Sequence, residues 1–236
     1  MSNSYFHFKQ FTIHQDKCAM KVSTDACIQG AWTPIDIKVQ DVLDIGAGTG
    51  LLSLMLAQRN SQLQIDAIEL DGDAAMQAHE NITNSPWQDR INVIHADVLE
   101  YSFSKQYDMV ICNPPFFQNS LLGPDNKRNN VRHTLSLSFD SLFDVIKKVL
   151  KPSGYASVLL PIAEYEIWAD IVAKERWHIN KILKVVPKQG QECNRVVSIC
   201  SPSAVELSEE TIEIYRGINT YTPAFVQLMQ PFYQKL

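Results

Sequence analysis

The sequence predicts an α/β fold in which helices cover both faces of a seven-stranded, mostly parallel sheet. Short apolar runs typical of buried strands alternate with stretches whose apolar residues recur at helical spacing. The turn after the first of these strands is rich in glycine, as at nucleotide sites of such folds. The last two strands are joined without a helix and should pair in opposite directions. We therefore expect a doubly wound sheet with one antiparallel strand.

The composition is that of a globular protein, with 45% hydrophobic and 20% charged residues among 236. Neither a basic-then-apolar leader nor an apolar run of roughly twenty residues is present, so we expect a soluble, cytoplasmic protein without a membrane partner. The five cysteines show no Cys-x-x-Cys pair or zinc spacing, and no metal site is expected. Residues 1–119 carry a charge of −7 and residues 120–236 a charge of +2, which permits an RNA partner for the second half.

One domain is expected over residues 1–236, with no obligate protein partner evident. Its parts are an N-terminal extension of strands and a helix (1–40), a core sheet (41–200) and a C-terminal helical tail (201–236). In the extension, alternating residues predict two short strands, and Thr24 or Asp25 is expected to cap a helix that ends near Pro34.

The strands and helices of the core follow in order. The seven strands are expected at 41–45, 64–69, 91–95, 109–112, 155–160, 177–186 and 195–200. The helices are expected at 51–59, 72–82, 139–150 and 163–175, with one or two short helices in the tail, over 205–216 and 222–233. The last two strands are predicted to form a hairpin at the sheet edge.

A glycine turn follows the first core strand. Gly46, Gly48 and Gly50 let the backbone approach a ligand, and the next helix begins with free amides. The spacing is Gly-x-Gly-x-Gly and not the Gly-x-Gly-x-x-Gly of dinucleotide sites. Asp44, just before the turn, suits a ligand with a cationic amino group better than a pyrophosphate.

Two carboxylates follow the next two strands. Glu69 stands 19 residues after Gly50, the separation expected for a group that accepts from ribose hydroxyls. Asp97 follows the third strand and is placed to accept from an adenine amine. Each alone is more often a surface carboxylate, but both at successive strand ends after a glycine turn favour a nucleoside site.

The strand at 109–112 stops at Asn113-Pro114-Pro115, because prolines donate no ladder hydrogen bond. The Asn113 side chain, the Pro114 carbonyl and the Phe116 ring can face one small space. Two acceptors beside an aromatic ring suit a planar exocyclic amine. A turn that merely ends a strand is the alternative, and the upstream glycine turn and carboxylates favour the site.

Residues 118–136 show no helical repeat and predict a long loop. Basic side chains in this loop and around the predicted hairpin are candidates to contact RNA phosphates, with a solvated loop as an equal alternative. They are Lys127, Arg128, Arg132, His133, Lys184, Lys188 and Arg195.

With these motifs in place, the chain resembles class I S-adenosylmethionine-dependent amino-methyltransferases, whose fold is Rossmann-like. Three flanking segments resemble one family more closely, the bacterial adenine-N6-methyltransferases that modify adenosine-37 of valine tRNA. They are Phe8–Asp16 with Met20–Asp25, Arg132–Ser136, and Tyr221–Tyr233.

The resemblance implies roles for the motif residues. Gly46, Gly48 and Gly50, with Asp44, would lie along the methionine part of S-adenosylmethionine. Glu69 would bind its ribose and Asp97 its adenine. Lys21, Thr24 and Asp25 would match an N-terminal motif on the cofactor side, and Asn113, Pro114, Pro115 and Phe116 would hold the target adenine.

In one place the sequence departs from this family. Ala26 stands where a glycine is expected after Thr-Asp, and Cys27, Ile28 and Gln29 replace a more apolar run. The contact of this segment with the cofactor therefore stays open. Protein-glutamine N5-methyltransferases, DNA adenine methyltransferases and a non-catalytic cofactor- or RNA-binding module remain alternatives.

Overall fold

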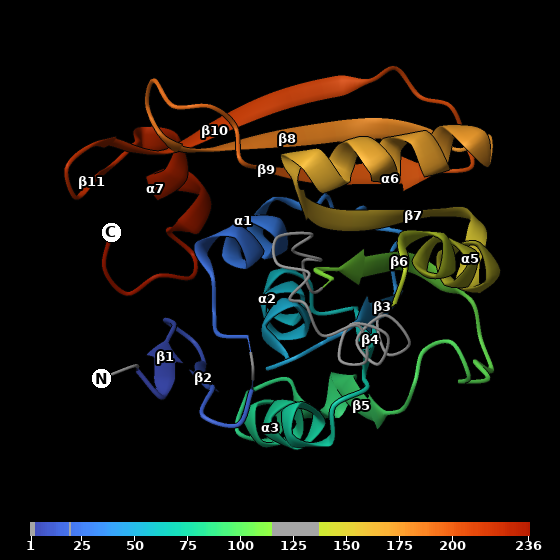
Figure 1. Cartoon of the computed structure of the whole chain (residues 1–236). Helices are drawn as coiled ribbons and strands as arrows, with labels where there is room; N and C mark the ends of the chain where they lie inside the picture. Colours follow the sequence, from blue (N-terminus) through green and yellow to red (C-terminus); the bar gives the residue numbers. More distant parts are fainter. Residues whose placement is uncertain (1–2, 19, 115–136) are drawn as a thin grey trace, which may run out of the picture.

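The computed structural model describes residues 3–18, 20–114 and 137–236, and within these ranges the chain forms a nine-stranded sheet beside a two-stranded one (Figure 1). The large sheet has the order β11-β10-β8-β9-β7-β6-β3-β4-β5. Its strands are β3 (Asp41–Ile45), β4 (Gln64–Glu69), β5 (Ile91–His95), β6 (Tyr107–Cys112), β7 (Leu150–Pro161), β8 (His178–Lys188), β9 (Arg195–Ser201), β10 (Ser208–Gly217) and β11 (Thr220–Tyr221).

The seven predicted core strands are all present and lie next to one another. Strands β5, β4, β3, β6 and β7 are parallel neighbours, and β9 runs antiparallel to both β7 and β8. The doubly wound prediction with one antiparallel strand in this set is confirmed. The prediction of a hairpin at the edge is wrong in its position, because β9 lies between β7 and β8, and β10 continues the sheet beyond β8.

The C-terminal tail is not wholly helical. Residues 208–217 form strand β10, which pairs parallel with β8, where a helix over 205–216 was expected. Ile212 and Ile214 are buried while the residues between and before them are more exposed, an alternation with a period of two that belongs to a strand. The second predicted segment does contain a short helix, α7 (Pro223–Met229).

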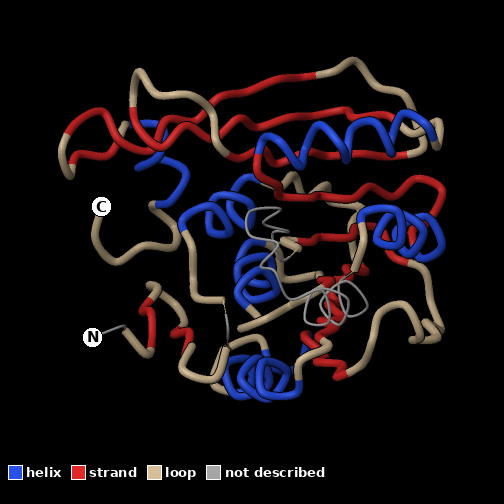
Figure 2. Tube along the Cα trace, viewed as in Figure 1, coloured by secondary structure: helices blue, strands red, loops and turns tan. Residues whose placement is uncertain are grey.

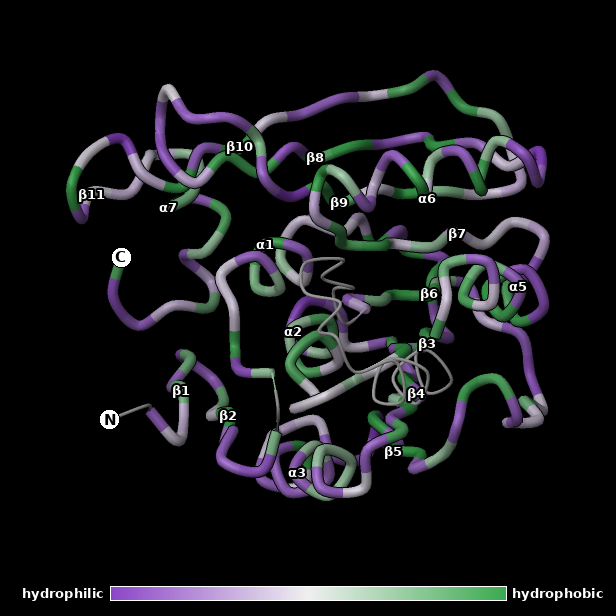
Figure 3. Tube along the Cα trace, viewed as in Figure 1, coloured by the Kyte–Doolittle hydropathy of each residue, from purple (hydrophilic) through white to green (hydrophobic). Residues whose placement is uncertain are grey.

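Helices cover both faces of the sheet (Figure 2). One core joins the sheet to α1 (Thr24–Trp32), α2 (Leu51–Arg59), α3 (Gly72–Thr83) and α7, and a second core joins its other face to α5 (Phe139–Val149) and α6 (Ile162–Lys174). The central strands carry hydrophobic colour along much of their length in Figure 3, as expected for strands buried on both faces. A short 3-10 helix, η1 (Gln88–Arg90), precedes β5.

Helix α1 begins one residue earlier than predicted. Ser23 is its N-cap, with an extended backbone and a side chain that accepts from the Ala26 N–H, so Thr24 and Asp25 lie in the first turn. The error arose because three consecutive residues, Ser23, Thr24 and Asp25, are all favourable N-caps.

The N-terminal and C-terminal segments of the described chain lie on the same side of the molecule (Figure 1). The small sheet pairs β1 (Tyr5–His7) with β2 (Thr12–His14), in agreement with the predicted alternation. Phe8 forms an isolated antiparallel bridge with Tyr233, and the Lys9 N–H donates to the Phe232 carbonyl at 2.8 Å. None of the described helices is long and apolar enough to cross a membrane.

Candidate functional site

The carboxyl ends of four neighbouring strands bring the predicted site residues to one edge of the sheet. Ile45 pairs with Ile68 on β4 and with Cys112 on β6, so the glycine turn, Glu69 and Asn113 follow in adjacent strands. Glu69 in turn pairs with His95, two residues before Asp97. This edge, at the point where strand order reverses, is where open α/β sheets bind ligands.

The glycine turn has the backbone that the spacing suggested. Gly46, Gly48 and Gly50 have φ angles of +71°, +54° and +79°, a region that glycine adopts without strain. A Cβ at Gly46 would meet no atom within 4 Å, and one at Gly48 only the Gly46 carbonyl at 4.0 Å. The turn therefore has an open side where a ligand can approach the main chain, whereas Gly50 faces Ile82 and Ala78.

The Glu69 carboxylate joins this turn to the start of α3. Its Oε2 accepts from the Gly48 N–H at 2.8 Å, and its Oε1 accepts from the Asp71 N–H at 2.9 Å. Each carboxylate oxygen has a further lone pair, so Glu69 can fix the loop and still accept from a diol.

Asp44 is fully buried at the end of β3. Its Oδ2 accepts from the N–H and hydroxyl of Ser53, at 3.1 and 2.7 Å, whereas Oδ1 has no hydrogen-bond partner among the described residues. Burial raises the pKa of Asp44 to about 7, with a smaller contribution from the negative charge of Glu69, although the bonds from Ser53 oppose the shift. A buried carboxylate oxygen without a donor suits a cationic ligand group.

Asp97 organises the turn after β5. Its Oδ1 accepts from the Leu99 N–H at 2.9 Å, and its carbonyl accepts from the Tyr101 N–H at 2.9 Å. The side chain is half-buried, as is that of Asn113.

At the end of β6, Asn113 Oδ1 is buried and accepts no hydrogen bond among the described residues, and Pro114 is buried beside it. An unpaired amide oxygen at a strand end is an acceptor available to an incoming N–H donor. Pro115 and Phe116 lie outside the described residues, so the predicted aromatic contact is not described.

The N-terminal motif lies around the start of α1. Asp25 Oδ2 is 3.5 Å from Arg195 Nε, which ties α1 to β9, and burial raises the pKa of Asp25 against the opposing charge of Arg195. Thr24 and Cys27 contact the Tyr233 hydroxyl. Lys21 Nζ lies 3.4 Å from the Asn3 carbonyl.

The basic residues predicted to bind RNA are only partly described. Lys184 is paired with Glu209 at 2.7 Å, and Arg195 with Asp25 as above, so both already have acidic partners. Lys188 is exposed at the carboxyl end of β8. Lys127, Arg128, Arg132 and His133 lie outside the described residues.

Sequence reasoning missed two buried polar residues at this site. One is Ser53, the donor to Asp44, and the other is Gln29, whose amide reaches the Cys112 carbonyl. Gln29 had a signal, since a glutamine between apolar residues of a buried helix requires a partner. Ser53 had none, because serine is common in helices.

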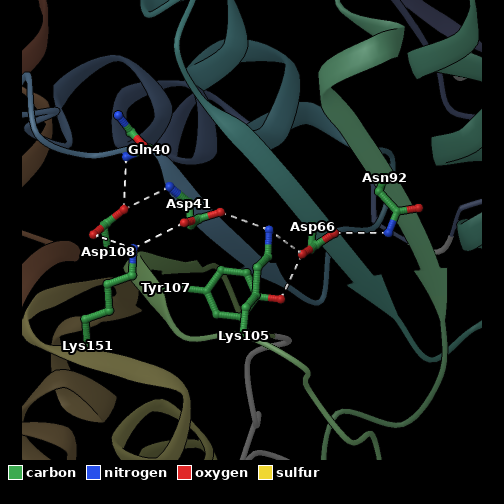
Figure 4. Close-up of polar contacts among 8 residues, drawn as sticks. All are labelled: Gln40, Asp41, Asp66, Asn92, Lys105, Tyr107, Asp108 and Lys151. Atoms are coloured by element: carbon green, nitrogen blue, oxygen red, sulfur yellow. Dashed lines mark hydrogen bonds and ion pairs between the residues drawn. The ribbon is translucent and has the colours of Figure 1, made fainter.

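The two clefts at the opposite, amino edge of the sheet, about 510 and 290 Å³, lie away from these residues. Figure 4 shows the polar network between them, in which Lys105 and Lys151 bridge three aspartates that lie on or beside the strand starts. Lys105 contacts Asp41 and Asp66 at 3.0 and 3.1 Å, and Lys151 contacts Asp108 and Asp41 at 2.9 and 3.2 Å. These mutually neutralising pairs, with Asn92, Tyr107 and the Gln40 backbone, indicate a structural role.

The carboxyl edge fits S-adenosylmethionine on three observations. The glycine turn leaves open space that a Cβ would enter, Asp44 presents an unpaired oxygen, and Glu69 stands one strand away. A ligand with an amino group and a ribose fits this arrangement, with the amino group at Asp44 and the ribose hydroxyls at Glu69.

Comparison with known proteins agrees with the fold and identifies the family. Residues 33–134 match the family model described as the methyltransferase small domain. A curated tRNA1(Val) (adenine(37)-N6)-methyltransferase from Dyadobacter fermentans is 42% identical over 99% of this chain and 98% of its own length. A second, from Tolumonas auensis, is 40% identical over 100% of this chain and 99% of its own.

A solved structure described as a predicted O-methyltransferase from Agrobacterium tumefaciens has a TM-score of 0.70. It covers 88% of this chain and 96% of its own, and its 18% identity supports the fold alone. The class I methyltransferase fold is therefore confirmed. By its full-length identity to the curated relatives, the chain belongs to the tRNA1(Val) (adenine(37)-N6)-methyltransferase family.

Proposed function

We propose that this protein transfers a methyl group from S-adenosylmethionine to N6 of adenosine-37 in valine tRNA, in the cytoplasm. One observation carries the proposal. Asn113 Oδ1 has no hydrogen-bond partner among the described residues, and the open glycine turn follows the neighbouring strand at the same edge of the sheet. The identity to curated relatives over the whole chain supports the choice of substrate.

The cofactor is assigned to the residues of the carboxyl edge. Asp44 and the turn at Gly46, Gly48 and Gly50 would bind its methionine part, Glu69 its ribose hydroxyls and Asp97 its adenine amine. Lys21, Thr24 and Asp25 would close this side of the site. When bound, S-adenosylmethionine supplies an electrophilic methyl group.

Asn113 and Pro114 would hold the target amine. A target adenine has to leave its stack to reach them. The Asn113 side-chain oxygen and the Pro114 carbonyl would then accept hydrogen bonds from the two N6–H groups. These bonds would direct the nitrogen lone pair toward the methyl group. Phe116 would stack on the base, and Pro115 would restrict the backbone next to Pro114. The nitrogen becomes acidic as the methyl group is transferred, so no strong general base is required. Positioning of the two reactants should therefore supply most of the rate gain.

RNA phosphates would be bound by the basic residues Lys127, Arg128, Arg132, His133, Lys184, Lys188 and Arg195. Among them, Lys188 has the exposure and the place at the carboxyl edge that a phosphate contact requires.

The test uses total tRNA from cells that lack the protein, incubated with the enzyme and labelled S-adenosylmethionine. We expect labelled N6-methyladenosine in a single tRNA species after the nucleosides are resolved by mass. Label that enters glutamine of a protein extract and not RNA would overturn the substrate while leaving the fold unaffected.

A further inference from the structure

A buried side-chain amide contacts the end of β6, next to Asn113. Gln29, in the middle of α1, is 0% exposed, and its Nε2 donates to the Cys112 carbonyl at 3.0 Å. The same nitrogen lies 3.2 Å from the Ser157 carbonyl and 3.4 Å from the Ser157 hydroxyl on β7. Gln29 thus joins α1 to the last residue of β6 and to its neighbouring strand.

The contact with the Cys112 carbonyl explains why a polar side chain stands at this buried position. Its Oε1 is buried without a partner among the described residues, so the side chain keeps an unfavourable polar atom in the core. An apolar side chain of similar size would fill the position without that cost. The donor group at Nε2 must therefore account for the amide.

The backbone beyond Cys112 is where such a donor has an effect. Pro114 has no N–H, so the main chain cannot be held by ladder hydrogen bonds donated from that residue. The carbonyl that Gln29 binds belongs to the peptide unit that leads into Asn113. Fixing the plane of that unit fixes the direction in which the Asn113 side chain leaves the sheet.

We propose that Gln29 is a positioning residue for methyl transfer, acting through the Cys112 carbonyl on Asn113. This inference rests on the proposed role of Asn113. Geometry at a reacting centre is sensitive to small displacements, whereas the cofactor contacts proposed for the glycine turn do not include this peptide.

The first test replaces Gln29 with methionine, which keeps the volume and removes the donor. We expect kcat for tRNA methylation to fall about tenfold, equivalent to about 1.4 kcal/mol, while the cofactor Kd changes by less than twofold. Thr33→Val is the matched control. It removes the 2.8 Å bond between the Thr33 and Ser157 hydroxyls in the same buried cluster, leaves the Cys112 contact, and should leave kcat unchanged.

A second variant keeps the inference testable if Gln29→Met does not fold. In Gln29→Glu a protonated carboxyl can donate to the Cys112 carbonyl and an ionised one cannot, so the ratio of its kcat to the wild-type value should rise as pH falls from 8.5 to 6.5. A kcat for Gln29→Met within twofold of wild type, or a ratio for Gln29→Glu that falls as pH falls, would overturn the inference. Asn113→Ala, measured in parallel, separates the two claims: if it stays active, the role of Asn113 itself fails.

Discussion

The role proposed for Asp44 would couple cofactor binding to pH. Its pKa is raised to about 7, chiefly by burial, so it is mostly neutral at pH 6 and mostly ionised at pH 8. If the carboxylate binds the amino group of S-adenosylmethionine, affinity should fall on acidification. We expect the ratio of wild-type to Asp44→Asn affinity to drop about tenfold from pH 8 to pH 6, measured by calorimetry.

Ser53→Ala provides the control for this measurement. It removes a hydrogen bond that lowers the pKa of Asp44, so the midpoint of the pH dependence should move upward. An affinity ratio that does not vary over this range would show that Asp44 does not contact a cationic group.

The role proposed for Asn113 leads to a different prediction, because its unpaired Oδ1 would accept a hydrogen bond from the target amine and not from the cofactor. Asn113→Ala should lower kcat by about 10²–10³ with cofactor affinity within twofold of wild type. Single-turnover kinetics and equilibrium binding measure the two quantities separately. Loss of cofactor binding would reassign the residue to the cofactor site.

Among the elements, α7 has a cap whose contribution can be measured. The Thr222 hydroxyl accepts from the Phe225 N–H at 3.2 Å and donates to the Glu213 carbonyl of β10, so one side chain joins the helix to the strand. Thr222→Ala should lower the free energy of unfolding by about 1 kcal/mol, and Thr222→Ser should retain most of it. Denaturant titration measures this, and equal stability of Thr222→Ala and wild type would contradict the assignment.

Some of the strands could be predicted from the sequence and others could not. Strands β3 to β7 were predictable because each is a short apolar run, and the glycine turn and strand-end residues followed from their order. Strand β10 was predictable in principle, since Thr211, Ile212 and Ile214 are β-branched and Glu213 stands between the two isoleucines. Its place beside β8 was not, because a parallel pairing between distant segments leaves no local signal.

At the site, polar residues next to strand ends could be found from the sequence, but their partners could not. The bond from Gly48 to Glu69 joins the glycine turn to the end of β4, and the pair of Asp25 with Arg195 joins α1 to β9. Such contacts depend on the tertiary arrangement. Gln29 illustrates this difference. The sequence shows a polar residue within an apolar helix, but it does not show that the Cys112 carbonyl is the acceptor.

At the scale of the whole molecule, the network at the amino edge (Figure 4) joins the starts of β3, β4, β6 and β7. Burial alone would raise the pKa of Asp108, but the N–H of Asp41 and the Lys151 ammonium outweigh it and lower the pKa. A carboxylate with a lowered pKa stabilises the fold above its unfolded pKa, and this stabilisation is lost as pH falls through the folded value.

Lys151→Met should therefore destabilise the protein by about 1 kcal/mol at pH 7, because the pairs are partly exposed. The difference from wild type should shrink below about pH 4, where the aspartates become protonated, as followed by urea titration at several pH values. Lys148→Met, in the same cleft but outside this network, is the control. A difference that does not shrink at all between pH 5 and pH 3 would mean that Lys151 acts through packing.

The most direct test of the central claim is methyl transfer to an unmodified valine tRNA transcript, compared with the same transcript in which only adenosine-37 is changed. We expect label in the first and none in the second, with Asn113→Ala inactive on both. Equal labelling of the two transcripts would place the target elsewhere in RNA, and labelling by Asn113→Ala at the wild-type rate would contradict the proposed site.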